Sequence, residues 1–89
     1  MTIEELVEKV CDILGPNPYP YDVTLRAFLI IREREDLFKA YTELNLPDNN
    51  RHIGHLIKEH YGFADAGNPV DISEYILIKS FTPLKKIRL

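Results

Sequence analysis

The sequence predicts a single α+β domain that is mostly α-helical, with four helices and a C-terminal β-strand or short hairpin. Apolar residues recur at helical spacing through most of residues 2–61, whereas the run near residues 74–81 is rich in β-branched and aromatic residues, which favour a strand. The chain has 89 residues, enough for one small domain and too few for two. Hydrophobic residues make up 45% of it and charged residues 28%, so a folded domain is expected.

The first helix is expected over residues 2–14. Thr2 is a good N-cap residue and Glu5 follows three positions later, which predicts a capping box. Gly15 and the proline after it end the helix. Residues 15–20, Gly-Pro-Asn-Pro-Tyr-Pro, then predict a stiff, extended linker, because three of the six are prolines.

Two further helices are expected over residues 22–34 and 36–45. The first is apolar nearly all round, which predicts a buried helix with Asp22 as its cap. Its β-branched residues are also compatible with a β-strand over part of the segment. A run of five charged residues, 32–36, interrupts the apolar stripe. We therefore expect either one bent helix or two helices, the second of them capped by Asp36.

The fourth helix is expected over residues 50–61. A turn precedes it, and Asp48 or Asn49 is expected to cap it. Gly54 lies in the middle of this helix, where glycine costs about 1 kcal/mol relative to alanine. We therefore expect Gly54 to permit close packing against a neighbouring helix. Gly62 ends the helix.

The C-terminal part, residues 63–89, is expected to contain a loop over residues 63–71 and the strand over residues 74–81. A lone strand is not stable, so it needs a partner. Three partners fit the sequence: residues 63–64, the tail at residues 87–89, or the same strand of a second subunit in a dimer.

Charge is distributed unevenly along the chain. The net charge is −3, and residues 1–45 hold five Lys and Arg against nine Asp and Glu, whereas residues 46–89 hold six against five. An acidic N-terminal half and a basic C-terminal segment suit a domain that presents one side to a polyanion. Basic C-terminal tails also increase solubility, and the overall acidity of the chain counts against a DNA-binding protein, because such domains are usually basic.

From residue 22 onward the expected order of elements is helix, helix, turn, helix, loop and strand. Three features accompany this order: Ile53-Gly54-x-x-Ile57, the Gly62-Phe63 stop, and Gly67 in the following loop. Together, residues 22–81 resemble the winged-helix form of helix-turn-helix DNA-binding domains, with the helix-turn-helix-like region at residues 22–62. In that family the third helix enters the major groove of duplex DNA. The resemblance implies a non-enzymatic nucleic-acid-binding domain, which could be a small regulator.

Carried onto this chain, the family pattern implies that the fourth helix meets the nucleic acid. The implied nucleic-acid-binding residues are Asn49, Asn50, Arg51, His52 and His55 at base edges, Lys58 at phosphate, and Lys85, Lys86 and Arg88 in the basic tail. The other interpretation of this helix is an ordinary solvated face. The expected wing carries Asp65 and Asp71, where the family pattern would place a basic residue.

The rival function is a helical adaptor that docks on another protein. An exposed edge strand at Tyr75–Phe81 could pair with a partner chain or with itself. The aromatic residues outnumber what so small a core needs, so some are expected to be anchors. The aromatic residues from which such anchors would come are Tyr19, Tyr21, Phe63, Tyr75 and Phe81.

Other classes of function find no support in the sequence. There is no phosphate-binding loop, zinc-protease motif or nucleophile elbow, so we expect no enzyme and no catalytic residues. His52, His55 and His60 offer at most two ligands on one helix face, and Cys11 is the single cysteine, so no metal or cofactor is expected. The chain shows no signal peptide and no apolar run of membrane length, which predicts a soluble, cytoplasmic protein without membrane contact.

Overall fold

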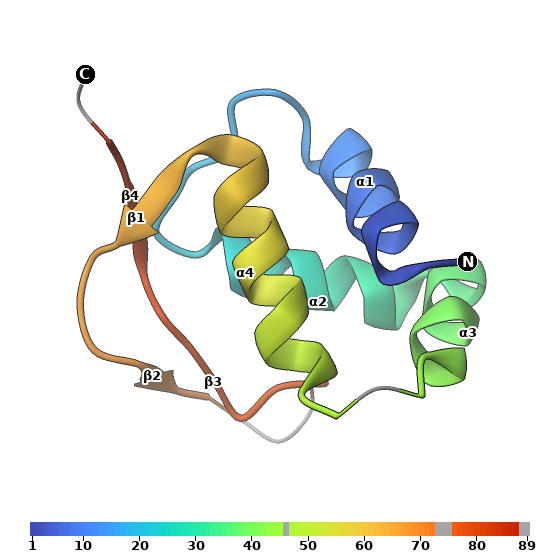
Figure 1. The fold of residues 1–89 in the computed structure, drawn as a ribbon. Coiled ribbons are helices and arrows are strands. Elements are labelled where there is room, and N and C mark those ends of the chain that lie inside the picture. Colours follow the sequence, from blue (N-terminus) through green and yellow to red (C-terminus); the bar gives the residue numbers. More distant parts are fainter. Residues whose placement is uncertain (46, 73–75, 88–89) are drawn as a thin grey trace.

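Four helices and four short strands make up the fold, seen in a computed structural model that describes residues 1–45, 47–72 and 76–87 (Figure 1). The elements are α1 (Ile3–Leu14), α2 (Val23–Glu33), α3 (Glu35–Glu43), α4 (Asn49–Tyr61), β1 (Phe63–Asp65), β2 (Val70–Asp71), β3 (Ser80–Phe81) and β4 (Leu84–Lys86). The predicted class, a mostly α-helical α+β domain, is confirmed.

Helix α1 begins with the predicted capping box. The Thr2 hydroxyl oxygen accepts a hydrogen bond from the Glu5 N–H at 3.1 Å, and the Glu5 carboxylate accepts one from the Thr2 N–H at 3.0 Å. The hydrogen bond from the Thr2 backbone is the main reason why the pKa of Glu5 lies below its usual value. Gly15 closes the helix with a φ of 87°, a conformation that favours glycine.

Helices α2 and α3 are separated by one extended residue, Arg34, with φ −100° and ψ 117°. The Arg34 N–H donates to the Ile30 carbonyl, and the Arg34 carbonyl accepts from the Phe38 N–H, so the chain leaves one helix and enters the next without a loop. The two-helix interpretation of the charged run is therefore confirmed, and the strand alternative is wrong. Asp36 does not cap α3, because it lies inside the first turn.

The predicted side-chain caps of α2 and α4 do not form. Asp22 and Asp48 occupy the N-cap positions, but neither has the extended backbone from which a cap side chain reaches the helix N–H groups. The Asp22 carboxylate instead accepts from Arg26 Nε, and Asp48 is left-handed with a φ of 58°. The Asn49 amide nitrogen donates to the Leu44 carbonyl at 3.1 Å, which ties the preceding turn to the start of α4.

Gly62 ends α4 in a left-handed conformation with a φ of 69°, as predicted. The close packing predicted for Gly54 is wrong. A Cβ placed there would lie 3.8 Å from Thr24 Cγ2 of α2, which is an ordinary van der Waals contact. No backbone approaches closely enough to require glycine.

Replacing Gly54 with alanine is therefore expected to raise the free energy of unfolding by about 0.5–1 kcal/mol, because alanine loses less chain entropy on folding. Urea denaturation followed by helical circular dichroism would measure the change. Gly62→Ala is the matched control and should lower stability, because its left-handed backbone strains any residue with a Cβ. A loss of stability for Gly54→Ala would contradict the packing described above.

The C-terminal strands pair in a nested pattern, in which the first strand pairs with the last and the two middle strands pair with each other. β1 pairs with β4, and β2 pairs with β3, both antiparallel. In this register Phe63 lies opposite Lys86 and Val70 lies opposite Phe81. We call residues 63–72 and 76–87 the β arm; Figure 1 shows it curving beside α4.

The β arm corrects the predicted strand boundaries. Residues 63–71, expected as a loop, contain β1 and β2. Of the strand expected at residues 74–81, only residues 80–81 are strand; residues 76–79 are not, and residues 74–75 lie outside the described part of the chain. Residues 63–64 do pair, but with β4. The physical reason is that Ile78 turns into the core, where it is 7% exposed, instead of extending a ladder.

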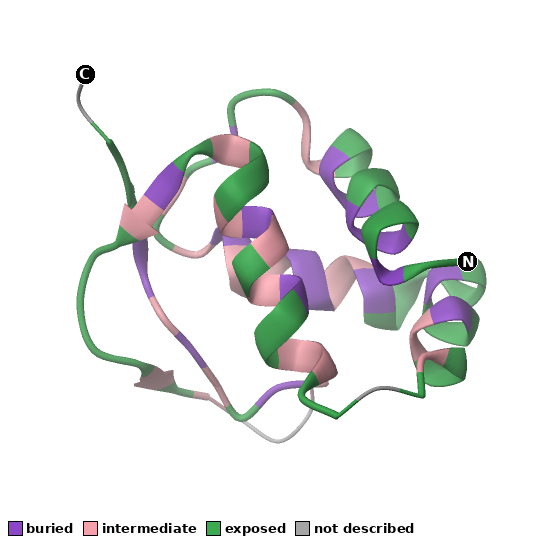
Figure 2. Cartoon of the chain, in the orientation of Figure 1, coloured by how far each residue is buried: buried purple, intermediate pink, exposed green. Residues whose placement is uncertain are grey.

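The core gathers apolar side chains from all four helices and from the β arm, as the inward-facing buried segments in Figure 2 show. The largest fully buried side chains are Phe28, Leu6, Ile31, Leu37, Ile53, Ile57, Val10 and Val23. α1 packs against each of the other helices, whereas α3 and α4 have little direct contact with one another. Among the described helices, none has the length and hydropathy to cross a membrane.

Candidate nucleic-acid interface

An open groove of about 1040 Å³ separates the outer side of α4 from the β arm. We call it the α4 groove. Thr24 and Phe28 of α2 line part of it. Its α4 side is lined by Asn50, Arg51, His52, Gly54, His55 and Lys58, together with Pro47 and Asp48 of the preceding turn, and its arm side by Asp65, Pro69, Ile78, Lys79, Ser80, Phe81, Thr82 and Leu84.

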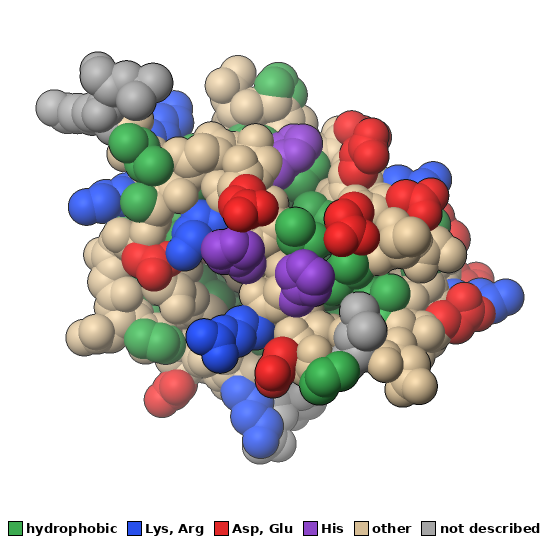
Figure 3. Space-filling view, in the orientation of Figure 1, with side chains coloured by type: hydrophobic (Ala, Val, Ile, Leu, Met, Phe, Trp, Pro, Cys, Tyr) green, Lys and Arg blue, Asp and Glu red, His purple; other side chains and the backbone are tan. Residues whose placement is uncertain are grey.

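The α4 groove carries more positive charge than the rest of this acidic domain. Three cationic side chains line it, against the carboxylates of Asp48 and Asp65. Figure 3 shows histidines together with Lys and Arg side chains on the face above α4, with carboxylates among them. Arg51 and Lys79, one from each wall, form no ion pair with any described residue.

Two of the predicted residues contact carboxylates along this face. Lys58 Nζ lies 3.0 Å from the Asp65 carboxylate, which joins α4 to β1. His55 Nε2 lies 3.0 Å from the Glu59 carboxylate one turn along α4, and both side chains are largely exposed. The family pattern would place a basic residue where Asp65 lies, and in the structure the Asp65 carboxylate pairs with Lys58. Pairs this exposed contribute little to stability and can exchange partners.

Asn49 and Asn50 differ from the other predicted residues, because their amides are engaged inside the protein. The Asn50 side chain accepts a hydrogen bond from the Tyr41 hydroxyl of α3 at 2.5 Å and donates one to the Leu77 carbonyl of the β arm at 3.0 Å. Asn49 donates to the turn before α4. The structure therefore brings Arg51, His52, His55 and Lys58 together at the groove, while the two asparagines hold its end in place.

The predicted tail residues separate from the groove. Lys85 and Lys86 are exposed on β4 and do not line it, and Arg88 lies outside the described residues. Lys79 was not among the predicted site residues, yet it lines the groove. Lys79 belongs to the same basic C-terminal segment as Lys85 and Lys86, and this was the feature of the sequence that could have indicated it. Its position at the groove depends on the β arm, which runs beside α4.

Buried reactive groups serve the packing of α1 on α4. The Tyr61 hydroxyl lies 2.8 Å from the Gly15 carbonyl and 3.2 Å from the Cys11 carbonyl, positioned to donate to either. Burial raises the pKa of the Cys11 thiol and that of Tyr61 above their usual values. Both groups are therefore protonated at neutral pH. Among the described residues, no three His, Cys, Asp or Glu side chains converge as a metal site would require.

Of the anchor candidates for an adaptor, two lie inside the protein and two remain on its surface. Phe63 and Phe81 are buried in the core, and Tyr75 lies outside the described residues. Tyr19 and Tyr21 remain on the surface, with 67% and 45% of their area exposed.

Comparisons of the chain with protein-family models, with curated proteins and with solved structures found no match.

Proposed function

We propose that this domain binds duplex DNA through the α4 groove and has no enzymatic role. The observation that carries the proposal is the pair of exposed cationic side chains, Arg51 and Lys79, which line one groove from a helix and from an extended arm. The resemblance of residues 22–81 to winged-helix domains supports it. The alternative, docking on another protein, retains only Tyr19 and Tyr21 of its predicted anchors among the described residues.

The dimensions of α4 suit a duplex. Its 13 residues span about 20 Å, and an α-helix fits the major groove of B-DNA, which is about 12 Å wide. Arg51 in its first turns can make the paired hydrogen bonds that guanine accepts. Lys79, from the β arm, would then lie where it can meet phosphate. The carboxylates of Asp48 and Asp65 limit affinity, so we expect a dissociation constant of about 1–100 μM for a random duplex.

Fluorescence polarisation with a random duplex at about 50 and 200 mM salt tests the proposal. Replacing both Arg51 and Lys79 with alanine should weaken binding and reduce the slope of log affinity against log salt by about 1, because one phosphate contact, that of Lys79, is lost and each such contact contributes about 0.9. Lys58→Ala is a poorer choice, because it also leaves Asp65 unpaired in the groove.

The matched control replaces Arg32 and Lys39 with alanine. Both side chains are exposed, neither lines the groove, and the change in net charge is the same. If both double variants lose affinity equally, the effect is general electrostatics and the α4 groove is not the site. Full affinity in the groove variant would also reject the proposal.

A further inference from the structure

A second surface lies where the linker between α1 and α2 runs along β4. The Leu84 N–H donates to the Tyr21 carbonyl at 3.4 Å, which joins the end of the linker to β4. A hollow of about 270 Å³ is lined by Pro16 and Asn17 at one end of the linker and by Lys86 of β4. The linker therefore meets β4 at both of its ends, and Figure 1 shows it passing β1 and β4 before it enters α2.

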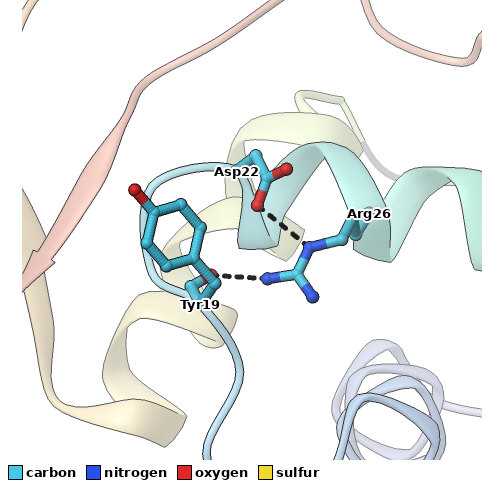
Figure 4. A network of polar contacts seen from close by, with 3 residues as sticks. All are labelled: Tyr19, Asp22 and Arg26. Carbon is cyan, nitrogen blue, oxygen red and sulfur yellow. Dashed lines mark hydrogen bonds and ion pairs between the residues drawn. The ribbon is translucent and has the colours of Figure 1, made fainter.

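Tyr19 is presented from this linker by contacts that leave its ring free. Arg26 Nη2 donates to the Tyr19 carbonyl and Arg26 Nε donates to the Asp22 carboxylate at 3.0 Å. Figure 4 shows this network with the ring of Tyr19 directed away from Arg26. Prolines on both sides of Tyr19 restrict the backbone further. The exposed ring is thus held at a defined place on the surface.

The second ring, Tyr21, connects this surface to the α4 groove. Its ring packs edge-on against Phe81, with centroids 6.2 Å apart, and Phe81 lines the groove. Tyr21 is nonetheless 45% exposed. Tyr21 therefore lies next to the groove, and Tyr19 lies two residues further back along the linker.

Charge on this surface favours an anionic ligand. Lys86 is exposed on β4, lines the hollow beside the linker and forms no ion pair within the described residues. The carboxylate of Asp22, the acidic residue that follows Tyr21, is paired with Arg26. Exposed aromatic rings beside unpaired cations are the combination that binds single-stranded nucleic acid, because bases stack on rings while phosphates meet the cations.

We propose that Tyr19 and Tyr21, with Lys86, form a stacking platform for single-stranded nucleic acid next to the α4 groove. The platform would receive the unpaired strand that leaves a duplex held in the groove. The proposal extends the proposed function from duplex DNA to a junction between duplex and single strand. Binding of a junction rests on the proposed function, because it requires the α4 groove to hold the duplex. Binding of a free single strand to the platform does not require it.

The test compares three labelled ligands by fluorescence polarisation: a blunt duplex, the same duplex with an overhang of about six thymidines, and free oligothymidine. For the unaltered protein, the overhang should tighten binding by about tenfold. Tyr19→Ala should abolish this gain and weaken oligothymidine binding, without changing affinity for the blunt duplex. Tyr19→Phe keeps the ring and should retain the gain.

Tyr19→Ala leaves the fold intact, because the Arg26 contact uses the Tyr19 carbonyl and the ring is 67% exposed. Equal urea midpoints for both Tyr19 variants and the unaltered protein would verify this. An overhang without effect, or equal losses for Tyr19→Ala and Tyr19→Phe, would overturn the platform. Loss of oligothymidine binding in Tyr19→Ala without any blunt-duplex binding would support the platform and reject the α4 groove as a duplex site.

Discussion

Replacing Phe28 with alanine is expected to remove a large part of the free energy of unfolding. Phe28 is 1% exposed and is the largest of the fully buried side chains. Removing a buried phenyl ring costs about 3–5 kcal/mol, because its apolar surface is lost and a cavity remains. A domain of this size has a total stability of about 4–13 kcal/mol. The variant should therefore unfold at a much lower urea concentration than the unaltered protein.

Phe38→Ala is the matched control for this measurement. Phe38 lies on α3 with 39% of its area exposed, and its main aromatic contact is a tilted pair with Tyr41. We expect this variant to lose about 1 kcal/mol or less. Urea denaturation followed by circular dichroism compares the two. Similar losses at the two positions would contradict the burial of Phe28 described above.

Replacing Asn50 with aspartate is the second large effect expected, although the two side chains have the same shape. A carboxylate can still accept from the Tyr41 hydroxyl, but it cannot donate to the Leu77 carbonyl, so two oxygen atoms would face each other. A half-buried acceptor without a donor costs about 1–3 kcal/mol, and more when it is charged. The loss should appear both in stability and in the attachment of the β arm.

Hydrogen exchange localises that effect. The Ile72 N–H donates to the Lys79 carbonyl across the β arm, so it should exchange faster in Asn50→Asp than in the unaltered protein. Acidification should restore part of the stability, because a protonated carboxyl can donate to Leu77. Asn45→Asp, on an exposed residue, is the control and should change neither quantity. An unchanged Ile72 exchange rate would show that Asn50 does not hold the arm.

The helices could be predicted from the sequence because their signals are local. The Thr2–Glu5 capping box and the glycine stops each act within a few residues, and apolar periodicity marks the faces between them. The charged run at residues 32–36 left two outcomes open, because the break depends on the backbone of one residue, Arg34. Local sequence preferences do not decide between an extended and a helical conformation for arginine.

The β arm could not be predicted, because its strands are two or three residues long and their partners are distant in sequence. Strands this short carry no periodicity, so pairing alone defines them. Asn50 illustrates the same difficulty at the candidate site. An amide that can read adenine can equally donate to one backbone carbonyl and accept from a tyrosine, and only the fold shows which contact is made.

The packing of α1 bears on how the chain folds during synthesis. α1 leaves the ribosome before α4, and Tyr61, whose hydroxyl meets the carbonyls of Cys11 and Gly15, is made about fifty residues after Cys11. Until α4 emerges, the apolar face of α1 has only α2 and α3 to cover it. At a typical rate of about 5–20 residues per second, that nascent intermediate persists for several seconds. It is the stage at which a chaperone would find exposed apolar surface to bind.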